Sequence, residues 1–436
     1  MPPLRRRRRR APGAPYKKGW LSRRPRRKNA DYGTSLTDDA LSAIFARLVN
    51  AADLVRCAAT SCRWGRIVAR QAPPVLSHGR PASPTLALGF FHQDDAPATA
   101  QKRKLFVPMA TAAARVLGFR WRSFSALFEA VGSDVLEPFL EHSRPIASRN
   151  GRVVLELARE GHGDDLKLCV CNPMTGDVSM LPPLSGKDKP GFYVCTLLTA
   201  DDLLEPPCTT TFFRVLIVYN RPSFTALRSY SSETGRWSAE ARRSVPKKIN
   251  TRRMQQLRHA VVLRGVAYWT LRHTAFAVRS DTPEPVEVAM LARGLADLWP
   301  NNCVLGATPD GKLVFLYMVR CVDFVGVGGK GFHPPPAGPG DDMDMDMSKG
   351  EWQYRQIKIN LEQLKVEDAS AINVRWFCER SGIVLFTLGD ELSSCPGTYA
   401  LNLATHDVIK VSTAHSWTNF CGYEMDHAAS LASVVA

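Results

Sequence analysis

The segment CNPMTGDV, residues 171–178, lines up with YSSETGRW, residues 230–237, and both place Thr-Gly between β-prone residues. Two later segments repeat parts of this pattern: GEW at 350–352 and LNLATHDV at 401–408. Thr-Gly or Asp-Gly between apolar alternations indicates a hairpin turn, because glycine adopts positive φ at little cost. The pattern therefore predicts a β-hairpin that recurs along the chain.

The spacing of these hairpins predicts one structural repeat. The turns are separated by 59 residues (176 to 235), 115 (235 to 350) and 56 (350 to 406), so the middle interval is close to double. Asp281-Thr282-Pro283 lies inside it and is the candidate for the missing turn. A multi-stranded repeat of roughly 50 residues is typical of a β-propeller of the kelch type. We therefore predict about six blades over residues 85–425; a β-sandwich with evenly spaced hairpins is the alternative.

Period-two apolar runs supply the strands of this repeat, and several begin just after a glycine. Residues 325–348 interrupt the pattern with Gly, Pro and Asp-Met repeats, and predict a flexible inserted loop. The predicted strands are Val153–Leu157, Phe213–Tyr219, Val266–Leu271, Leu313–Val319 and Ile383–Leu388, with one more hairpin formed by Leu86–Phe91 and Lys104–Val107.

Residues 35–72 have a helical pattern instead. Thr37 is a candidate N-cap, and Asp38 and Asp39 would lie favourably at the positive end of the helix dipole. Leu41, Ile44, Phe45 and Leu48 then form one apolar stripe, and two more short helices follow before Pro73 and Pro74. Three short helices in so few residues need a partner or a following domain to cover their apolar faces.

The segment SLTDDALSAIFARLVNAADLVRCAATSCRWGRIVAR, residues 35–70, resembles the F-box, the helical motif that docks on the adaptor subunit of SCF ubiquitin ligases. It departs from the motif at Thr37 and Val49, where proline is common. The positions that carry the resemblance are Leu36, Asp38, Asp39, Leu41, Ile44, Phe45, Leu48, Asp53, Leu54, Arg56, Cys57 and Trp64.

The downstream region resembles the β-propeller that accompanies F-boxes in plant proteins. The likeness rests on residues 170–176 with Leu181-Pro182-Pro183, on 265–269 and on 399–403. It implies an α+β multidomain chain in which a small three-helix F-box at 35–72 precedes an all-β propeller. Such a protein recruits an unidentified target protein to the ligase and performs no catalysis itself. The residues that the resemblance implies for the adaptor contact are Leu36, Leu41, Ile44, Phe45, Leu48 and Leu54, some of which must pack the module's own interior.

The net charge of +16 is concentrated in the first residues of the chain. Residues 1–30 hold 13 of the 57 Lys and Arg and no acid, which leaves 44 bases against 41 acids, or +3, for the remainder. We expect residues 1–33 to be disordered, and nucleic-acid contact, if any, to be confined to this tail. The basic clusters predict nuclear targeting, with a solubilising leader as the alternative; they comprise Arg5, Arg6, Arg7, Arg8, Arg9, Arg10, Arg23, Arg24, Arg26, Arg27 and Lys28.

Motifs of catalysis and metal binding are missing from the sequence. Gly326–Gly331 lacks the Ser or Thr of a phosphate-binding loop, and Cys169-x-Cys171 has no second ligand pair. We therefore expect no catalytic residues, no metal and no cofactor. The odd number of cysteines, 11, favours reduced thiols and a location in nucleus and cytoplasm. No apolar stretch approaches the ~20 residues of a membrane span.

Two other classes of function remain open. A nuclear nucleic-acid-binding protein would use the Arg-rich tail, with the propeller as its scaffold. A hydrolase or oxidoreductase would assemble its site from propeller loops far apart in the sequence.

Overall fold

The computed structural model describes the chain in segments between residues 36 and 424. These are 36–48, 57, 63–64, 67–68, 87–94, 104–109, 122–123, 143–157, 165–172, 177–203, 212–242, 249–257, 259–271, 274–279, 286–288, 290–293, 302–308, 311–320, 324–332, 343–346, 351–360, 372–389, 396–413 and 417–424. The predicted tail at 1–33 lies outside the described residues, and the predicted F-box at 35–72 is described in part.

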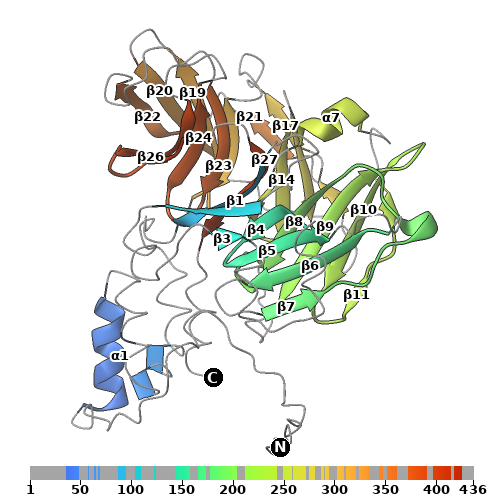
Figure 1. Ribbon diagram of the computed structural model, residues 1–436, viewed down its shortest axis with the longest axis horizontal. Helices are drawn as coiled ribbons and strands as arrows, with labels where there is room; N and C mark the ends of the chain where they lie inside the picture. Colours follow the sequence, from blue (N-terminus) through green and yellow to red (C-terminus); the bar gives the residue numbers. More distant parts are fainter. Residues whose placement is uncertain are drawn as a thin grey trace, which may run out of the picture.

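The protein is mainly β and forms a six-bladed propeller (Figure 1), which confirms the predicted architecture of the larger domain. Each blade is an antiparallel sheet, and the first strands of successive blades contact one another around the ring, as β27 does with β4 and β4 with β8. Blade 1 contains β27 (Trp417–Glu424), β1 (Ala87–Asp94), β2 (Lys104–Pro108) and β3 (Arg122–Ser123); blade 2 contains β4 (Arg144–Arg149), β5 (Arg152–Leu157), β6 (Lys167–Asn172) and β7 (Asp177–Met180).

The remaining four blades follow in chain order, and the third has an extra strand that pairs with β10. Blade 3 contains β8 (Tyr193–Thr199), β9 (Phe213–Asn220), β10 (Thr225–Ser231), β11 (Arg236–Trp237) and β12 (Ala241–Arg242); blade 4 contains β13 (Val261–Leu263), β14 (Val266–Leu271), β15 (Thr274–Arg279) and β16 (Val286–Val288); blade 5 contains β18 (Cys303–Ala307), β19 (Leu313–Arg320), β20 (Phe324–Phe332) and β22 (Glu351–Asn360); blade 6 contains β23 (Ile372–Cys378), β24 (Ile383–Leu388), β25 (Gly397–Asn402) and β26 (Val408–Ser412).

Five further elements of the propeller domain lie outside the blade meanders. Strands β17 (Met290–Arg293) and β21 (Met343–Asp346) pair in parallel, and short helices occur at α7 (Thr251–Gln256), η4 (Gly186–Asp188) and η5 (Ala200–Asp202).

The ring closes through the two ends of the propeller domain. Strand β27, from the C-terminal end, pairs antiparallel with β1 from the N-terminal end, so blade 1 combines both. Around this junction Phe90 stacks on Phe420 at a ring-centroid distance of 4.3 Å. Since closure pairs the edges that an open ring would expose, it also removes two sheet edges.

The sequence repeat corresponds to the third and fourth strands of each blade. The two Thr-Gly segments lie between β6 and β7 and between β10 and β11, and the 401–408 segment joins β25 to β26. Asp281-Thr282-Pro283 falls between β15 and β16, where we predicted the missing turn. In the first hairpin of blades 2 and 4, Asn150-Gly151 and Arg264-Gly265 both have positive φ, as type I′ turns require.

The predicted loop at 325–348 is wrong over its described residues, since 343–346 form β21 and the first residues belong to β20. Residues 324–332 form β20, which pairs with β19 and β22. Glycine serves close packing here, since a Cβ on Gly328 would lie 2.5 Å from the Tyr317 ring. Gly328 therefore accommodates the aromatic ring of a neighbouring strand.

A glycine also permits close contact between blades 5 and 6. A Cβ on Gly306 in β18 would lie 1.9 Å from Cδ1 of the buried Phe377 in β23. We expect Gly306→Ala to lower the free energy of unfolding by about 1–3 kcal/mol, because the first strands must move apart. Urea denaturation measures this effect. Gly191→Ala, where no atom lies within 4 Å, is the control, and equal losses in both variants would contradict the interpretation.

Candidate functional site

Helix α1 (Asp38–Arg47) begins as the sequence predicted. Thr37 caps it, and its hydroxyl accepts a hydrogen bond from the Ala40 amide at 3.3 Å. Thr37 thus supplies a cap at a position where the F-box motif commonly has proline. The guanidinium of Arg63 donates to the Leu36 carbonyl at 2.6 Å and to Asp38 at 2.8 Å, which links the start of α1 to a distant part of the module.

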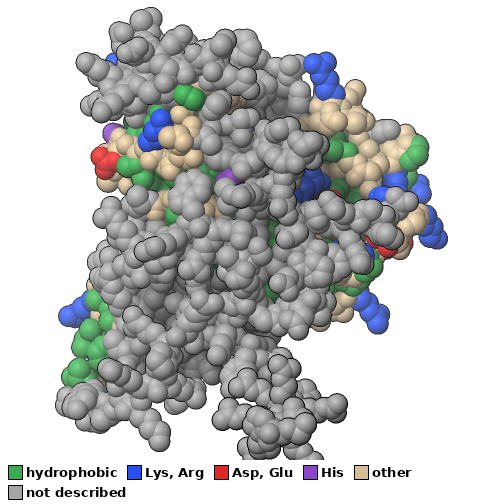
Figure 2. All heavy atoms as spheres, in the orientation of Figure 1, with side chains coloured by type: hydrophobic (Ala, Val, Ile, Leu, Met, Phe, Trp, Pro, Cys, Tyr) green, Lys and Arg blue, Asp and Glu red, His purple; other side chains and the backbone are tan. Residues whose placement is uncertain are grey.

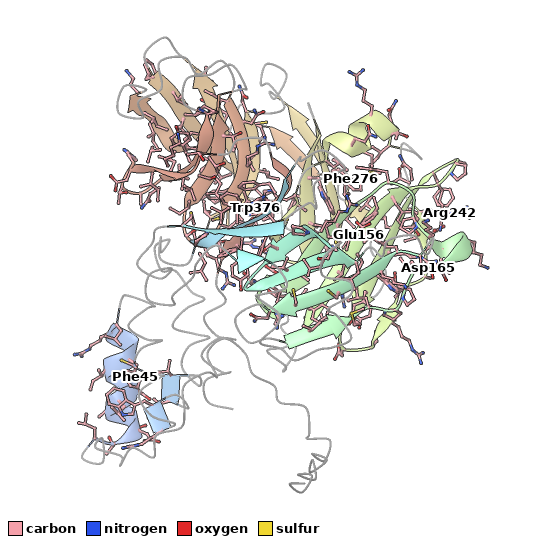
Figure 3. The ribbon with its side chains drawn as sticks, in the orientation of Figure 1. Phe45, Glu156, Asp165, Arg242, Phe276 and Trp376 are labelled. Carbon is pink, nitrogen blue, oxygen red and sulfur yellow. The ribbon has the colours of Figure 1, made fainter. Side chains whose placement is uncertain are left out.

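The helical module has a small core of its own. Leu41, Phe45, Ile67 and Val68 are buried together, and the rings of Phe45 and Trp64 meet edge to face at 5.3 Å. Figure 3 shows Phe45 pointing from α1 toward the neighbouring helical residues. Residues 57, 63–64 and 67–68 are helical, in agreement with the sequence pattern. Trp64 is partly buried and packs against this core.

The predicted adaptor contacts divide into two groups. Leu41 and Phe45 are 1% and 2% exposed, so they stabilise the module. Leu36 and Ile44 are 42% and 45% exposed, and Leu48 is half-buried. Leu54 and all of the predicted nuclear-targeting residues lie outside the described residues. The exposed apolar surface on the described part of α1 is thus carried by Leu36, just before the helix, and Ile44.

A second candidate site lies where the first strand of each blade turns into its second, which we call the first-turn end. Arg149, the last residue of β4, reaches three other blades there. Its guanidinium lies 2.7 Å from Asp202 of η5 and 2.7 Å from Glu379, and it donates to the Val262 carbonyl at 2.7 Å. One side chain therefore ties blades 2, 3, 4 and 6.

The electrostatics of this cluster follow from its burial. Burial alone would lower the pKa of Arg149, but the charges of Asp202 and Glu379 raise it above its usual value. Burial raises the pKa of Glu379 to about 7, against the opposing effect of Arg149. The guanidinium thus stays charged, while burial penalises the charged form of the Glu379 carboxyl.

Glu424, at the end of β27, holds the ring closure at the same end. Its carboxylate accepts hydrogen bonds from the Ser381 amide and hydroxyl, each at 2.8 Å. Its backbone carbonyl accepts from the Gly151 amide at 3.0 Å, and the Tyr423 hydroxyl donates to the Gly151 carbonyl at 3.0 Å. Blade 1 is thereby joined to blades 6 and 2.

A small cavity opens among these groups, and Trp376 and His259 stack beside it at a ring-centroid distance of 3.9 Å. The cavity lining includes Arg149, Glu379 and Glu424, and each of these side chains is hydrogen-bonded to other groups of the protein. This arrangement suits a structural tie between blades. Sequence reasoning missed it because Arg149 is separated from Asp202 by 53 residues and from Glu379 by 230, with no motif to connect them.

Within the described residues, no group of three or more His, Cys, Asp or Glu is placed to hold a metal ion. The seven cysteines described are free thiols, and Cys169 and Cys171 are buried in β6. Burial raises the pKa of the Cys169 thiol to about 12, which keeps it protonated and unreactive at neutral pH. None of the helices described here is long and apolar enough to span a membrane.

Comparison with known proteins gives one family match and several distant structural neighbours. A family model described as a domain of unknown function (DUF7595) matches residues 130–294, which contain β4 through β17. No curated protein matches the sequence.

Among solved structures, a post-proline cleaving enzyme from Rickettsia typhi is 10% identical with a TM-score of 0.35, over 88% of this chain and 58% of that one. A prolyl endopeptidase is 11% identical with a TM-score of 0.31, over 90% and 56%. An oligogalacturonate lyase solved with manganese is 10% identical with a TM-score of 0.31, over 75% and 86%. The chain spans less than two thirds of the length of the first two. Likeness at these scores carries no conclusion about activity.

Proposed function

We propose that the protein is the substrate-recognition subunit of an SCF-type ubiquitin ligase. The helical module would dock on the adaptor subunit, and the propeller would bind a target protein. The protein would then act without catalysis, by raising the effective concentration of target lysines near a ubiquitin-loaded enzyme.

The observation that carries this proposal is the division of apolar residues on α1. Leu41 and Phe45 are buried in the module's core, whereas the nearby Leu36 and Ile44 are 42% and 45% exposed. Exposed aliphatic side chains next to a packed core are the anchors by which a helix docks into a partner's groove. The propeller supports the proposal because its loops offer a broad surface for a protein target.

The test is a pull-down of the full chain with a plant SCF adaptor subunit. We expect the wild-type chain to bind and Ile44→Asp to lose about 2–4 kcal/mol of binding free energy, since a carboxylate would be buried against an apolar surface. Because Ile44 is 45% exposed in the free protein, the substitution leaves the module folded.

Ala43→Asp is the matched control. Ala43 is exposed, and helical spacing directs it away from the stripe formed by Leu41, Phe45 and Leu48. We expect it to bind like the wild-type chain. A wild-type chain that does not bind, or equal binding by wild type and Ile44→Asp, would refute the adaptor role.

A further inference from the structure

The end of blade 3 that lies opposite the first-turn end carries a cluster of basic and aromatic side chains. Three segments meet there: Phe192 just before β8, the turn 221–224 between β9 and β10, and Arg242 in β12. The strand register fixes this meeting, since Tyr193 pairs with Tyr219, Asn220 with Thr225, and Ala226 with Arg242. We call this surface the blade 3 basic face.

Polar contacts hold the face in one arrangement. Arg228 lies 2.8 Å from Asp188 of η4, and Arg221 donates to the Lys189 carbonyl at 3.2 Å. Glu240 accepts from the Tyr219 hydroxyl at 2.6 Å and from Arg221 at 2.7 Å. Because these contacts link the blade's strands to the segment before β8, the face is already formed in the free protein.

The charge of the face is positive. Five of its side chains are cationic (Lys187, Lys189, Arg221, Arg228 and Arg242) and two are carboxylates (Asp188 and Glu240), which leaves three positive charges. Figure 2 shows Lys and Arg side chains recurring along this edge of the molecule. Residues 31–436 as a whole carry a formal charge of only +3.

The blade 3 basic face also has an exposed aromatic side chain, that of Phe192. Phe192 is 48% exposed and follows Lys187 and Lys189 closely in the sequence. The guanidinium of Arg242 covers Phe224 at 4.6 Å from the ring centroid. An exposed aromatic residue flanked by cations suits a partner that combines carboxylates with an apolar side chain.

We propose that the blade 3 basic face binds an acidic protein segment, with an apolar side chain of that segment packing on Phe192. Charge complementarity favours this occupant. A nucleic-acid backbone presents continuous negative charge, which Asp188 and Glu240 would repel, whereas a peptide can place its carboxylates beside the cations alone. That this segment belongs to a ubiquitination target rests on the proposed function. The binding of the segment to the face does not require the adaptor subunit.

The experiment measures fluorescence anisotropy of the full chain with an array of short labelled peptides. Each peptide combines Asp and Glu with one Leu, Phe or Trp, and its counterpart has Asn and Gln in place of the acids. We expect the acidic peptides to bind more tightly than their amide counterparts, and the affinity to fall as salt is raised. Lys187→Glu should weaken binding about tenfold, and Phe192→Ser several-fold.

Arg236→Glu is the matched control. Arg236 is an exposed cation of the same blade but pairs with Ser231 at the opposite end, so we expect no change in affinity. Equal binding of acidic and amide peptides, or equal affinities for Lys187→Glu, Phe192→Ser and Arg236→Glu, would overturn the inference. Binding of single-stranded oligo(dT) in place of the acidic peptides would overturn it in favour of nucleic acid. A failed adaptor pull-down would leave the inference standing.

Discussion

Replacing Arg149 with methionine is expected to lower the free energy of unfolding by about 3–5 kcal/mol, because removing one member of a buried ionic group leaves the others uncompensated. Asp202 and Glu379 would both lose their guanidinium partner, and the side chain of Asp202 is 5% exposed. The Val262 carbonyl would lose a donor as well. Urea denaturation at neutral pH measures the loss.

Two further variants separate the ionic tie from simple side-chain loss. Arg236→Met removes an exposed arginine and should change the free energy of unfolding by no more than about 0.5 kcal/mol. Adding Asp202→Asn and Glu379→Gln to Arg149→Met removes the buried carboxylates, so it should recover part of the loss. A loss no larger in Arg149→Met than in Arg236→Met would show that Arg149 does not hold the blades together.

The blades could be predicted because their signals are local. Period-two apolar runs and turn glycines occur within a few residues of one another, and the predicted run Val266–Leu271 matches β14 at both ends. The repeat spacing then gave the architecture, since each blade needs neighbours to cover its two faces. The spacing also located the turn of blade 4, although its sequence departs from Thr-Gly.

Sequence alone could not divide the helical stripe at 41–48. Helical periodicity places Leu41, Ile44 and Phe45 on one side of α1, but the packing of Ile67 and Val68 decides which of them are buried. The same reason explains the error at β20. Glycines there suggested a loop. Gly328 instead lies against the Tyr317 ring of the neighbouring strand, which leaves no space for a side chain, and the sequence of β20 alone does not show this contact.

The buried charged residues were inaccessible for a further reason. Arg149, Asp202 and Glu379 come from three blades and carry no shared motif, so only the closed ring brings them together. In a propeller, side chains that meet at the end of the innermost strands are separated in sequence by whole blades. Prediction from local pattern therefore gives the blades but not the contacts at the centre.

His92 is expected to make the protein less stable by about 3 kcal/mol between pH 7 and pH 4, relative to a His92→Leu variant. Its side chain is fully buried in β1, with its ring 5.8 Å from that of Phe90. Burial lowers the pKa of His92 to about 4, whereas an unfolded histidine titrates near 6.5. Between these values the unfolded chain binds a proton that the folded chain does not, so stability falls as pH falls.

The comparison with His92→Leu is needed because Glu379 contributes with the opposite sign. Its folded pKa of about 7 lies above its ordinary value, so between pH 4.5 and 7 the folded chain binds the extra proton and stability rises as pH falls. The two effects partly cancel in the wild-type chain, but Glu379 is present in both proteins and drops out of their difference. Urea denaturation of both proteins across this pH range measures that difference. A difference that does not vary with pH would mean that His92 titrates in the folded protein as it does in the unfolded chain, and that it is not held neutral in the core of blade 1.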